Sequence, residues 1–449
     1  MSGFAENIEL PVAYLETLTL NNVRSFRKRN DIYFSYEHEL PSQWTVILGN
    51  NNTGKTTILK CIADLYLRTE KKSLKDYKDL SGIYVQTEED FYLLNTDKRN
   101  TNLITEKEGL YGLVLHTIGK FKPSIIENST GKNPILVPNW GIGLMEGELY
   151  GNNGHPHIKK VFLQGYSTQR KTSESSLSEQ ENTETVQSFF SNNFELINVE
   201  EWLLQINYAS KNDDSPKSNR ERAKSIEKRV REVITSEILP DIQDFRFRST
   251  QDFKNYIEFQ TDYGWVRLKD LGYGYQATLA WVMDLAKRMF DRYPTSKNPL
   301  AEPAVVLVDE IDLHLHPEWQ RKIVSYLSNI FKNTQFIVTA HSPLVVQSAE
   351  NVNLVMLEKD GDHINIRQQF GSFKGWTVDE ILTELMGMDD KTMSDTYLEL
   401  MKQFDEALDE DNYEKAHSAY EGLDKILHPS SPQRKILRIQ MSSLAPVEA

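Results

Sequence analysis

Short runs of apolar and β-branched residues recur along this chain and predict strands. Residues 44–48 (WTVIL), 304–308 (AVVLV) and 335–339 (QFIVT) are predominantly apolar, which is typical of strands buried on both faces of a sheet. Residues 160–164 (KVFLQ) have the same character. Residues 14–20 (YLETLTL) alternate apolar and polar side chains instead, which predicts a strand with one buried face.

Helical periodicity accompanies several of these runs. Residues 57–67 (TILKCIADLYL) have helical spacing soon after the first buried run, and residues 276–289 precede a later one. Strands that alternate with helices predict an α/β fold whose sheet contains parallel strands. After residue 368 the pattern changes to helices, at 377–386, 392–408 and 411–426.

Two stretches of different composition interrupt the α/β pattern. Residues 68–150 are mixed in character and rich in Asn, Gly and Lys. Residues 167–193 are dominated by Ser, Thr, Glu, Gln and Asn, which predicts a mobile excursion. We therefore expect an α/β domain over residues 1–370, split by insertions around 68–150 and 165–240, and a helical C-terminal region over 371–449.

Residues 49–56 (GNNNTGKT) fit the pattern G-x-x-x-x-G-K-[ST] between a predicted strand and a predicted helix. Glycines let the backbone wrap closely, so that successive N–H groups and the helix N-terminus face a triphosphate. Lys55 would neutralise the β- and γ-phosphates, and the Thr56 hydroxyl would ligate Mg²⁺. The alternative is a plain glycine-rich turn, but the flanking strand and helix favour a phosphate loop. The residues expected to bind nucleotide here are Gly49, Asn50, Asn51, Asn52, Thr53, Gly54, Lys55, Thr56 and Thr57.

Asp309 and Glu310 directly follow the buried run 304–308. Two carboxylates at the end of a buried strand need a cation, because burial of an unpaired charge is costly. We expect Asp309 to hold Mg²⁺ together with Thr56, and Glu310 to orient and deprotonate the attacking water. A solvated acidic strand end is the alternative interpretation.

His341 lies just beyond the run 335–339, at the strand end where ligands bind in α/β sheets. An imidazole there can donate a hydrogen bond to the γ-phosphate, which makes His341 a second candidate catalytic residue. The alternative is a histidine whose hydrogen bonds are satisfied within the fold.

Residues 271–276 (LGYGYQ) open a predicted helix with two glycines. Backbone N–H groups at such a turn can bind an anion. This turn is therefore a second candidate phosphate site, one that could close on a nucleotide held by another subunit.

Four motifs follow one another along the chain: the phosphate loop, the turn at 271–276, the Asp309–Glu310 pair and His341. Their order resembles that of the motifs in the ABC-type ATPase heads of the SMC, RecF and OLD group. The resemblance implies an ABC-type P-loop head, in which a mixed sheet is flanked by helices. It also implies ATP and Mg²⁺ as cofactors and a second subunit that completes the nucleotide site.

The resemblance identifies Gly272, Gly274 and Gln276 as signature residues that act in trans. That family usually has serine where this chain has Gly272, so a hydroxyl donor to the γ-phosphate is missing. Hydrolysis is therefore expected to be slow, or ATP to act mainly as a ligand. Gln164 occupies the place of the family's Q-loop glutamine, and a plain surface glutamine is the alternative.

Residues 375–385 (GWTVDEILTEL) and 427–437 (LHPSSPQRKIL) resemble the tails of stand-alone ATPases in bacterial anti-phage operons, above all the ATPase subunit of two-gene Septu systems. This resemblance implies a homo-oligomeric ATPase that regulates a separate HNH-type nuclease. The tail shows no strand-borne carboxylate set for a catalytic metal, so the chain itself is not expected to be a nuclease. The alternatives are an amphipathic helical cap for the tail, and a RecF- or SMC-like repair ATPase, a DNA clamp or a transporter subunit for the chain.

Charge restricts the contacts that this chain can make with DNA. A net charge of -14 repels nucleic acid on average, so any DNA contact of the complex must come from a local basic patch. Residues 217–232 carry seven basic and three acidic side chains and are one candidate, although a solvated helix with i,i+4 ion pairs is the alternative. A second basic group precedes the phosphate loop and consists of Arg24, Arg27, Lys28 and Arg29. It could line the adenine side of the nucleotide or touch DNA, and a solvated turn is the alternative.

Cysteine usage and hydropathy indicate the compartment. Cys61 is the only cysteine, which excludes a disulfide framework and a cysteine-cluster metal site. The sequence has no apolar run of about 18 residues and no basic segment followed by an apolar one at its start. We therefore expect a soluble, cytoplasmic protein without a membrane partner.

Overall fold

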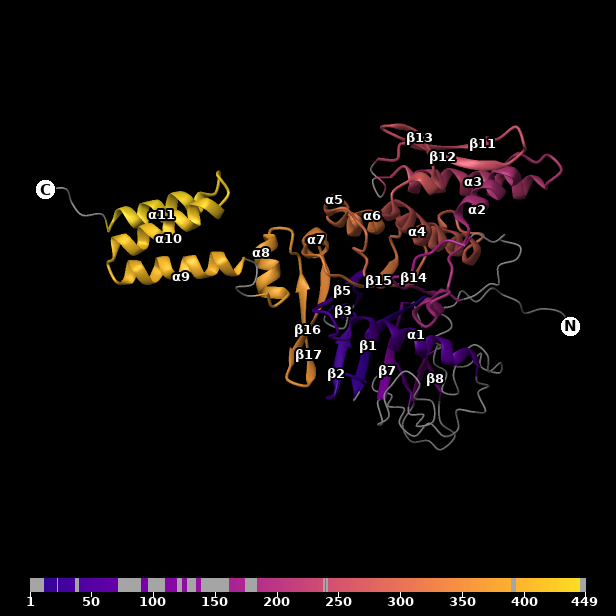
Figure 1. Cartoon of the computed structure of the whole chain (residues 1–449). Coiled ribbons are helices and arrows are strands. Elements are labelled where there is room, and N and C mark those ends of the chain that lie inside the picture. The colour runs from indigo at the N-terminus through magenta and orange to yellow at the C-terminus, as the bar shows by residue number, and fades with distance from the viewer. Residues whose placement is uncertain are drawn as a thin grey trace. The chain divides into compact units, whose positions relative to one another are not determined.

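The computed structural model of this chain divides into two compact units, Met1–Trp376 and Thr377–Ala449 (Figure 1). The residues that the structure describes are 12–21, 23–36, 40–71, 90–95, 110–118, 123–126, 135–138, 161–173, 184–236, 239, 241–388 and 393–444.

Within the described residues, the central sheet of the first unit has six strands in the order β10-β14-β15-β5-β16-β17. Their bounds are Leu163–Tyr166 (β10), Ala304–Val308 (β14), Thr334–Thr339 (β15), Trp44–Gly49 (β5), Val352–Asp360 (β16) and His363–Gly371 (β17). Strands β10 to β16 in this order run parallel, whereas β17 is antiparallel to β16. Every residue of β14 and β15 is buried, as expected for central parallel strands. The predicted buried strands are confirmed, although β10 begins at Leu163 and not at Lys160.

A second, antiparallel sheet packs with the helix that follows the phosphate loop. Its order is β2-β1-β7-β6, with β1 at Val12–Asn21, β2 at Asn30–Tyr33, β7 at Leu110–Ile118 and β6 at Asp90–Asn95. Helix α1 (Lys55–Lys71) shares one apolar core with both sheets, to which Leu18 of β1, Ile62 of α1 and Leu307 of β14 contribute. This shared core holds the start of α1 against the carboxyl end of β5.

Described parts of the insertion around 68–150 contain strands that the mixed sequence pattern did not predict. They are β6 and β7 of the second sheet and the antiparallel pair β8 (Pro123–Ile126) and β9 (Ile135–Pro138). The long-range pairing of β7 with β1 builds the sheet there, and pairing of that kind leaves little local trace in a sequence. Short strands β3 (Ser35–Tyr36) and β4 (Leu40–Pro41) pair just before β5.

The prediction of a mobile excursion over 167–193 is wrong for its described parts. Residues 184–193 include the 3-10 helix η4 (Thr185–Phe189), and Val186 and Phe189 of this helix are buried in the core of the first unit. The polar side chains have partners in the fold, since the Ser188 hydroxyl donates to the carbonyl of Gly165 at 3.1 Å. The polar side chains of this segment therefore form hydrogen bonds with β10, and their abundance is not a sign of disorder. Residues 174–183 lie outside the described part of the chain.

Helices and a small sheet cover one side of the central sheet. Helices α2 (Val199–Lys211) and α3 (Lys217–Ile234) pack between α4 (Tyr273–Arg292) and an antiparallel sheet of three strands (Figure 1). Those strands are β11 (Asp244–Ser249), β12 (Asn255–Thr261) and β13 (Gly264–Arg267). The remaining elements are η5 (Leu268–Asp270), η6 (Pro299–Ala301), α5 (Pro317–Gln320), α6 (Ile323–Ile330) and α7 (Pro343–Ser348).

The second unit is helical. Its elements are α8 (Val378–Glu380), the π-helical turn η7 (Ile381–Leu385), α9 (Asp395–Asp409), α10 (Tyr413–Ile426) and α11 (Pro432–Ser442). Ser394, Asn412 and Ser431 cap the N-termini of α9, α10 and α11 with their side-chain oxygens. Phe404, Ala416, Leu423 and Leu437 are among the residues of a separate apolar core. The predicted helices of the tail are therefore present, and the mixed sheet flanked by helices confirms the predicted fold class.

Candidate nucleotide-binding site

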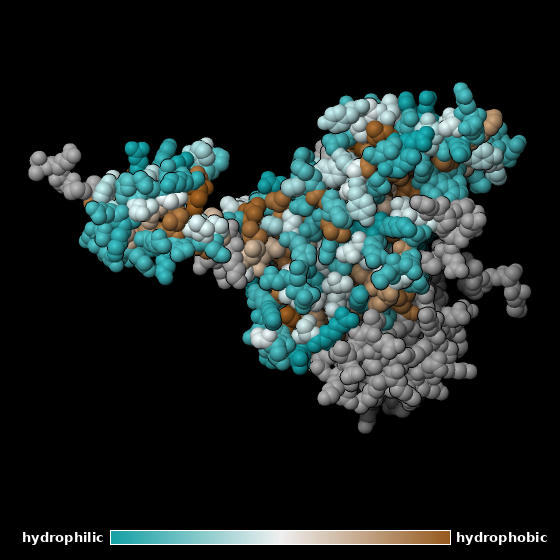
Figure 2. Space-filling model, viewed as in Figure 1, coloured by the Kyte–Doolittle hydropathy of each residue, from teal (hydrophilic) through white to brown (hydrophobic). Residues whose placement is uncertain are grey.

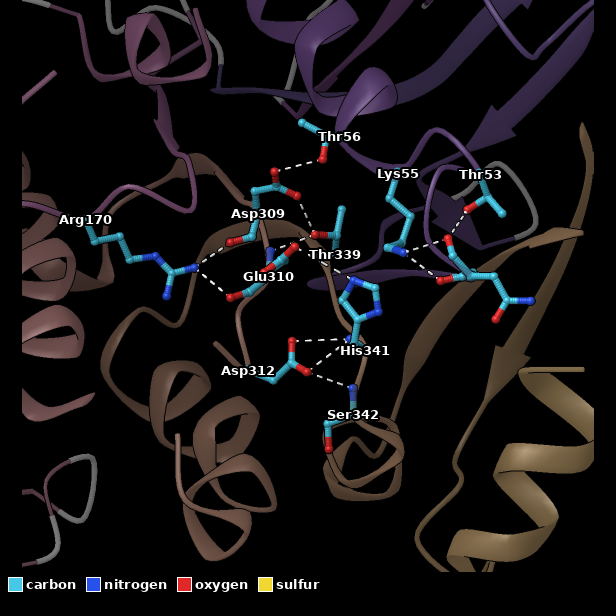
Figure 3. A network of polar contacts seen from close by, with 12 residues as sticks. Thr53, Lys55, Thr56, Arg170, Asp309, Glu310, Asp312, Thr339, His341 and Ser342 are labelled. Carbon is cyan, nitrogen blue, oxygen red and sulfur yellow. Dashed lines mark hydrogen bonds and ion pairs between the residues drawn. The ribbon is translucent and has the colours of Figure 1, made fainter. Parts of the chain in front are cut away.

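The carboxyl ends of β5, β14 and β15 bring the predicted site residues to one edge of the central sheet. The register pairs Val308 with Val338 and Thr339 with Ile47, so the three strands end at the same level. Ligands of open α/β sheets bind at this edge. Figure 3 shows the phosphate loop, the Asp309–Glu310 pair and His341 facing one another there.

The phosphate loop has a backbone that needs its two glycines. Gly49 and Gly54 have φ values of 154° and 99°. A Cβ at Gly49 would lie 2.6 Å from Thr53 Oγ1, and a Cβ at Gly54 would lie 2.8 Å from the ring of Phe26. Asn52 adopts a φ of 64°, which asparagine tolerates better than most residues. The local sequence therefore determines a tightly curved loop before α1.

Lys55 lies inside the curve of this loop. Its Nζ donates to the carbonyl of Gly49 at 2.6 Å and to that of Asn50 at 3.1 Å (Figure 3). Burial lowers the pKa of Lys55, while the carboxylates of Glu310 and Asp309 act in the opposite direction. The ammonium group is thus held between the loop and the acidic strand end. The three asparagine side chains of the loop are exposed.

A chain of hydroxyls and a carboxylate joins the loop to β14 and β15. The Thr56 hydroxyl donates to Asp309 Oδ2 at 2.9 Å, and the Thr339 hydroxyl donates to Asp309 Oδ1 at 2.6 Å. Asp309 is buried, so its carboxylate is held in place. A carboxylate beside a threonine hydroxyl is the type of oxygen donor set that Mg²⁺ takes when it also binds phosphate oxygens. These residues therefore fit the expected Mg²⁺ site.

Glu310 and His341 lie next to each other beside Asp309. Oε1 of Glu310 is 3.8 Å from Nε2 of His341, and the two side chains are 33% and 38% exposed. Glu310 has a φ of 47°, in the left-handed region that non-glycine residues seldom adopt. Both side chains can therefore reach a small molecule at the sheet edge.

Three further residues organise the site and were missed by the sequence reasoning. Thr339 binds Asp309, and Asp312 accepts hydrogen bonds from the backbone N–H groups of His341 and Ser342 at 3.0 and 2.7 Å. Thr339 ends the buried run 335–339, and Asp312 closely follows Glu310 in the sequence, so both could have been suspected from their positions.

Arg170 is the third missed residue, and no sequence signal marked it. Its Nη2 donates to the carbonyls of Asp309 at 2.5 Å and Glu310 at 2.8 Å. Burial lowers the pKa of Arg170 to about 10, and the nearby carboxylates, Asp309 foremost, oppose that shift. The guanidinium therefore remains a cation near neutral pH.

The predicted signature turn packs on the loop that follows Glu310. Gly272 caps α4 as its N-cap residue, and a Cβ at Gly274 would lie 2.3 Å from the carbonyl oxygen of His314. The side-chain amide of Gln276 donates to the Leu271 carbonyl at 2.7 Å, within the turn itself. The ring of Tyr273 meets that of His314 edge-on, with 4.7 Å between centroids. Gly274 thus has a packing role within its own subunit.

Gln164 has its hydrogen-bond partner inside the fold. It is on β10, is 3% exposed, and its Oε1 accepts a hydrogen bond from the Thr185 hydroxyl at 2.8 Å. This burial excludes the alternative interpretation of Gln164 as a plain surface glutamine. Its carboxamide is engaged inside the fold, so the structure brings no support to the assignment of Gln164 to the nucleotide.

The two groups of basic residues are largely paired. On α3, ion pairs at i,i+4 join Lys217 to Glu221, Lys228 to Glu232 and Arg231 to Glu227. In Figure 2 the surface over α3 carries mainly hydrophilic side chains. These pairs favour the interpretation of a solvated helix.

In the second group, Arg24 contacts the phosphate-loop helix, since its guanidinium donates to the Thr57 hydroxyl at 3.4 Å. Arg27 and Arg29 form exposed ion pairs with Asp362 and Asp31. These contacts agree with a turn that is in part solvated.

Two features are absent from the described part of the chain. No helix there is both long and apolar enough to cross a membrane. No group of three or more His, Cys, Asp or Glu side chains in those residues could hold a metal ion by itself. A Mg²⁺ ion at Asp309 would therefore need ligands from Thr56, water and phosphate as well.

Residues 44–347 match the family described as "AAA domain, putative AbiEii toxin, Type IV TA system". That match covers more than half of the 449 residues and includes the phosphate loop, Glu310 and His341. The chain belongs to this AAA-domain family. Its AAA domain thus contains every residue that the structure gathers at the sheet edge.

Individual relatives of this AAA protein include two from Bacillus. "Septu protein PtuA" of Bacillus thuringiensis is 37% identical over 209 residues, which is 45% of this chain and 52% of that protein. "Septu protein PtuA" of Bacillus mycoides (strain KBAB4) is 28% identical over 374 residues, which is 82% of this chain and 44% of that protein. The chain therefore spans about half the length of the curated relatives it matches.

Among solved structures, the chain is similar to an SMC head bound to the C-terminal winged-helix domain of ScpA. The identity is 16% and the TM-score 0.40, with 80% of this chain and 98% of that chain covered. A TM-score this low does not establish a shared fold. The fold of this chain is assigned from its strand order and from the AAA-family match.

Proposed function

We propose that this chain binds ATP with Mg²⁺ at the edge of the central sheet and hydrolyses it. The observation that carries the proposal is the hydrogen bond between Thr56 and Asp309, because it joins the phosphate loop to the acidic strand end. Glu310 and His341 lie beside that bond, where they can reach the γ-phosphate side of a nucleotide. Membership in the AAA-domain family supports the proposal.

Each residue of the proposed site has a defined task. The backbone N–H groups of residues 49–56 and the N-terminus of α1 bind the phosphates, and Lys55 neutralises their charge. Thr56 and Asp309 would hold Mg²⁺, which supplies charge neutralisation at the phosphate oxygens. Glu310 accepts a proton from the attacking water, and His341 donates a hydrogen bond to the γ-phosphate.

The signature turn is proposed to act on the nucleotide of a second subunit. Backbone N–H groups at Gly272 and Gly274 would face the γ-phosphate of the partner's ATP, with Gln276 holding the turn through its bond to Leu271. Gly272 has no hydroxyl to offer, so turnover is proposed to be slow. A Gly272→Ser variant that hydrolyses ATP faster would support this, whereas an unchanged rate in a folded variant would contradict it.

Replacement of Lys55 by alanine tests the nucleotide site. The variant loses the cation of the loop, and charge-assisted hydrogen bonds contribute about 1.5–3 kcal/mol each, so ATP affinity should fall at least roughly 100-fold. Titration calorimetry or a fluorescent ATP analogue would measure this. Lys60→Ala, on the same helix, is the matched control and should bind as the wild type does. If folded Lys55→Ala protein binds ATP as tightly as the wild type, the site assignment is wrong.

In the cell, we propose that this AAA protein is the cytoplasmic ATPase of an anti-phage defence complex. Identity to two proteins named Septu protein PtuA supports this. In the proposed complex the chain forms homo-oligomers, binds a separate HNH-type nuclease, and contacts DNA only as part of the complex. ATP occupancy would restrain or release the nuclease through the different affinities of two ATPase conformations for it.

Purification of the tagged chain, expressed from its native operon, tests this cellular role. Recovery of a stoichiometric nuclease that cuts DNA only within the complex would support it. A chain that purifies without an effector and instead loads a recombinase or clamps DNA would overturn the defence assignment. The RecF-like repair ATPase would then replace it.

A further inference from the structure

Arg170 has surroundings that are unusual for an arginine. Its side chain is buried, with 4% of the residue exposed, in the segment just after β10. One nitrogen, Nη2, donates to two successive backbone carbonyls, those of Asp309 and Glu310 (Figure 3). Its guanidinium carbon lies 6.0 Å from the ring centroid of Trp281 on α4. The guanidinium is therefore fixed in place and directed at the backbone of the acidic pair.

Glu310 is the residue in that pair whose backbone needs support. Its φ of 47° is uncommon for a residue with a β-carbon and costs energy, so it persists only where the surroundings hold it. Two contacts do so: the N–H of Glu310 donates to the Thr339 hydroxyl at 2.7 Å, and its carbonyl accepts from Arg170 at 2.8 Å. Backbone support on both sides determines where the Glu310 carboxylate points.

The carboxylate of Glu310 is held less closely than its backbone. It lies 3.8 Å from the imidazole of His341, which is longer than a hydrogen bond, and its side chain is 33% exposed. The positions that this carboxylate can reach therefore depend on where the backbone places the Cβ of Glu310. A displacement of about 1 Å at such a group can cost roughly 100-fold in rate.

We propose that Arg170 is a positioning residue for hydrolysis, which holds the backbone of Asp309 and the strained backbone of Glu310 so that the Glu310 carboxylate faces the attacking water. This inference rests on the proposed function of the site. Arg170 does not itself touch the nucleotide in this proposal, and it acts through Glu310.

The test compares Arg170→Met and Arg170→Lys with a matched control, Arg222→Met. Methionine keeps the bulk of the side chain but cannot donate, and lysine retains a donor and the charge. Arg222 also donates to a backbone carbonyl, that of Phe290 at 3.1 Å, outside the site. For each variant, kcat, the Kd for a non-hydrolysable ATP analogue, and hydrogen exchange of peptides covering 308–319 in the nucleotide-free protein are measured.

Arg170→Met is expected to lower kcat by about 10- to 100-fold while its Kd stays within about threefold of the wild type. Hydrogen exchange in 308–319 should become faster, with the rest of the first unit unchanged. Arg170→Lys should recover part of kcat, and Arg222→Met should match the wild type in every readout.

Three outcomes would overturn the inference. They are an unchanged kcat in folded Arg170→Met, unchanged exchange in 308–319, and a parallel loss of kcat and affinity with faster exchange throughout. If instead the proposed function is wrong, the wild-type protein itself will not bind or hydrolyse ATP. The exchange measurement needs no nucleotide and still decides whether Arg170 holds the backbone of 308–319.

Discussion

At the scale of single residues, the site depends on backbone conformations that few side chains permit. Gly49 and Gly54 adopt φ values of 154° and 99°, and their neighbours leave no room for a Cβ. Glu310 accepts an uncommon φ of 47° because its N–H and C=O both have partners. Strain of this kind concentrates at functional sites, where the surrounding structure supports it.

Glu310→Gln should separate binding from hydrolysis. The amide keeps the size of the side chain but cannot accept a proton from water, and general-base catalysis contributes about 10²–10⁴-fold, so kcat should fall at least roughly 100-fold. Affinity for ATP should remain, because the phosphate loop is untouched. Steady-state hydrolysis and nucleotide titration measure the two effects. Glu318→Gln, at an exposed residue paired with Lys322, is the control; wild-type turnover in Glu310→Gln would disprove the assigned base.

At the scale of elements, the start of α4 and the loop after β14 form one packed unit. Gly274 lies against the carbonyl of His314, and the ring of Tyr275 meets that of Trp319 edge-on at 4.2 Å between centroids. His314 has a φ of 63°, so the loop is itself tightly turned. A movement of the loop beside Glu310 would therefore be transmitted to the proposed signature turn.

Gly274→Ala should destabilise the fold at this contact. Its Cβ would lie 2.3 Å from a backbone oxygen, so α4 or the loop must shift, and overpacking of this kind costs about 1–3 kcal/mol. Denaturant unfolding would show the midpoint at a lower concentration. Gly272→Ser is the matched control for stability, because a Cβ there meets its nearest neighbour at 3.7 Å and serine is a good N-cap residue. Equal stability of Gly274→Ala and the wild type would show that the loop yields freely.

At the scale of the whole molecule, the proposed catalytic cycle needs two copies of the chain. Within one subunit the signature turn packs against its own post-Glu310 loop, so its γ-phosphate would come from a partner. The second unit, Thr377–Ala449, has its own apolar core and is a separate candidate for contacts between subunits or with a nuclease.

ATP should therefore drive association of two AAA domains. In the slow Glu310→Gln variant, saturating ATP with Mg²⁺ should shift more protein into a state with at least one additional 51.9 kDa chain, measured by light scattering after gel filtration. The same variant without nucleotide sets the baseline. Adding Lys55→Ala should abolish the shift, since nucleotide no longer binds. If the oligomeric state is the same with and without ATP, the proposal that two subunits bind the nucleotide between them is contradicted.

Local patterns in the sequence were enough to predict the phosphate loop and the strands that carry the candidate site residues. Buried strands such as 304–308 are recognisable because burial on both faces demands a continuous apolar run. The phosphate loop is recognisable because its glycines and Lys55 must be adjacent to wrap a phosphate. The carboxyl ends of parallel strands meet at one edge, so the proximity of Asp309, His341 and the loop also followed from the sequence.

Tertiary structure alone decided the features that depend on contacts between distant residues. Arg170 reaches the carbonyl of Asp309 across 139 positions, in a segment whose polar composition predicted mobility. Gln164 pairs with Thr185 inside the fold, and strands β6 and β7 form because β1 lies beside β7. A hydrogen bond or strand pair of this kind depends on which distant segments the fold brings together. Composition and periodicity could not predict it, because they describe only residues that are neighbours along the chain.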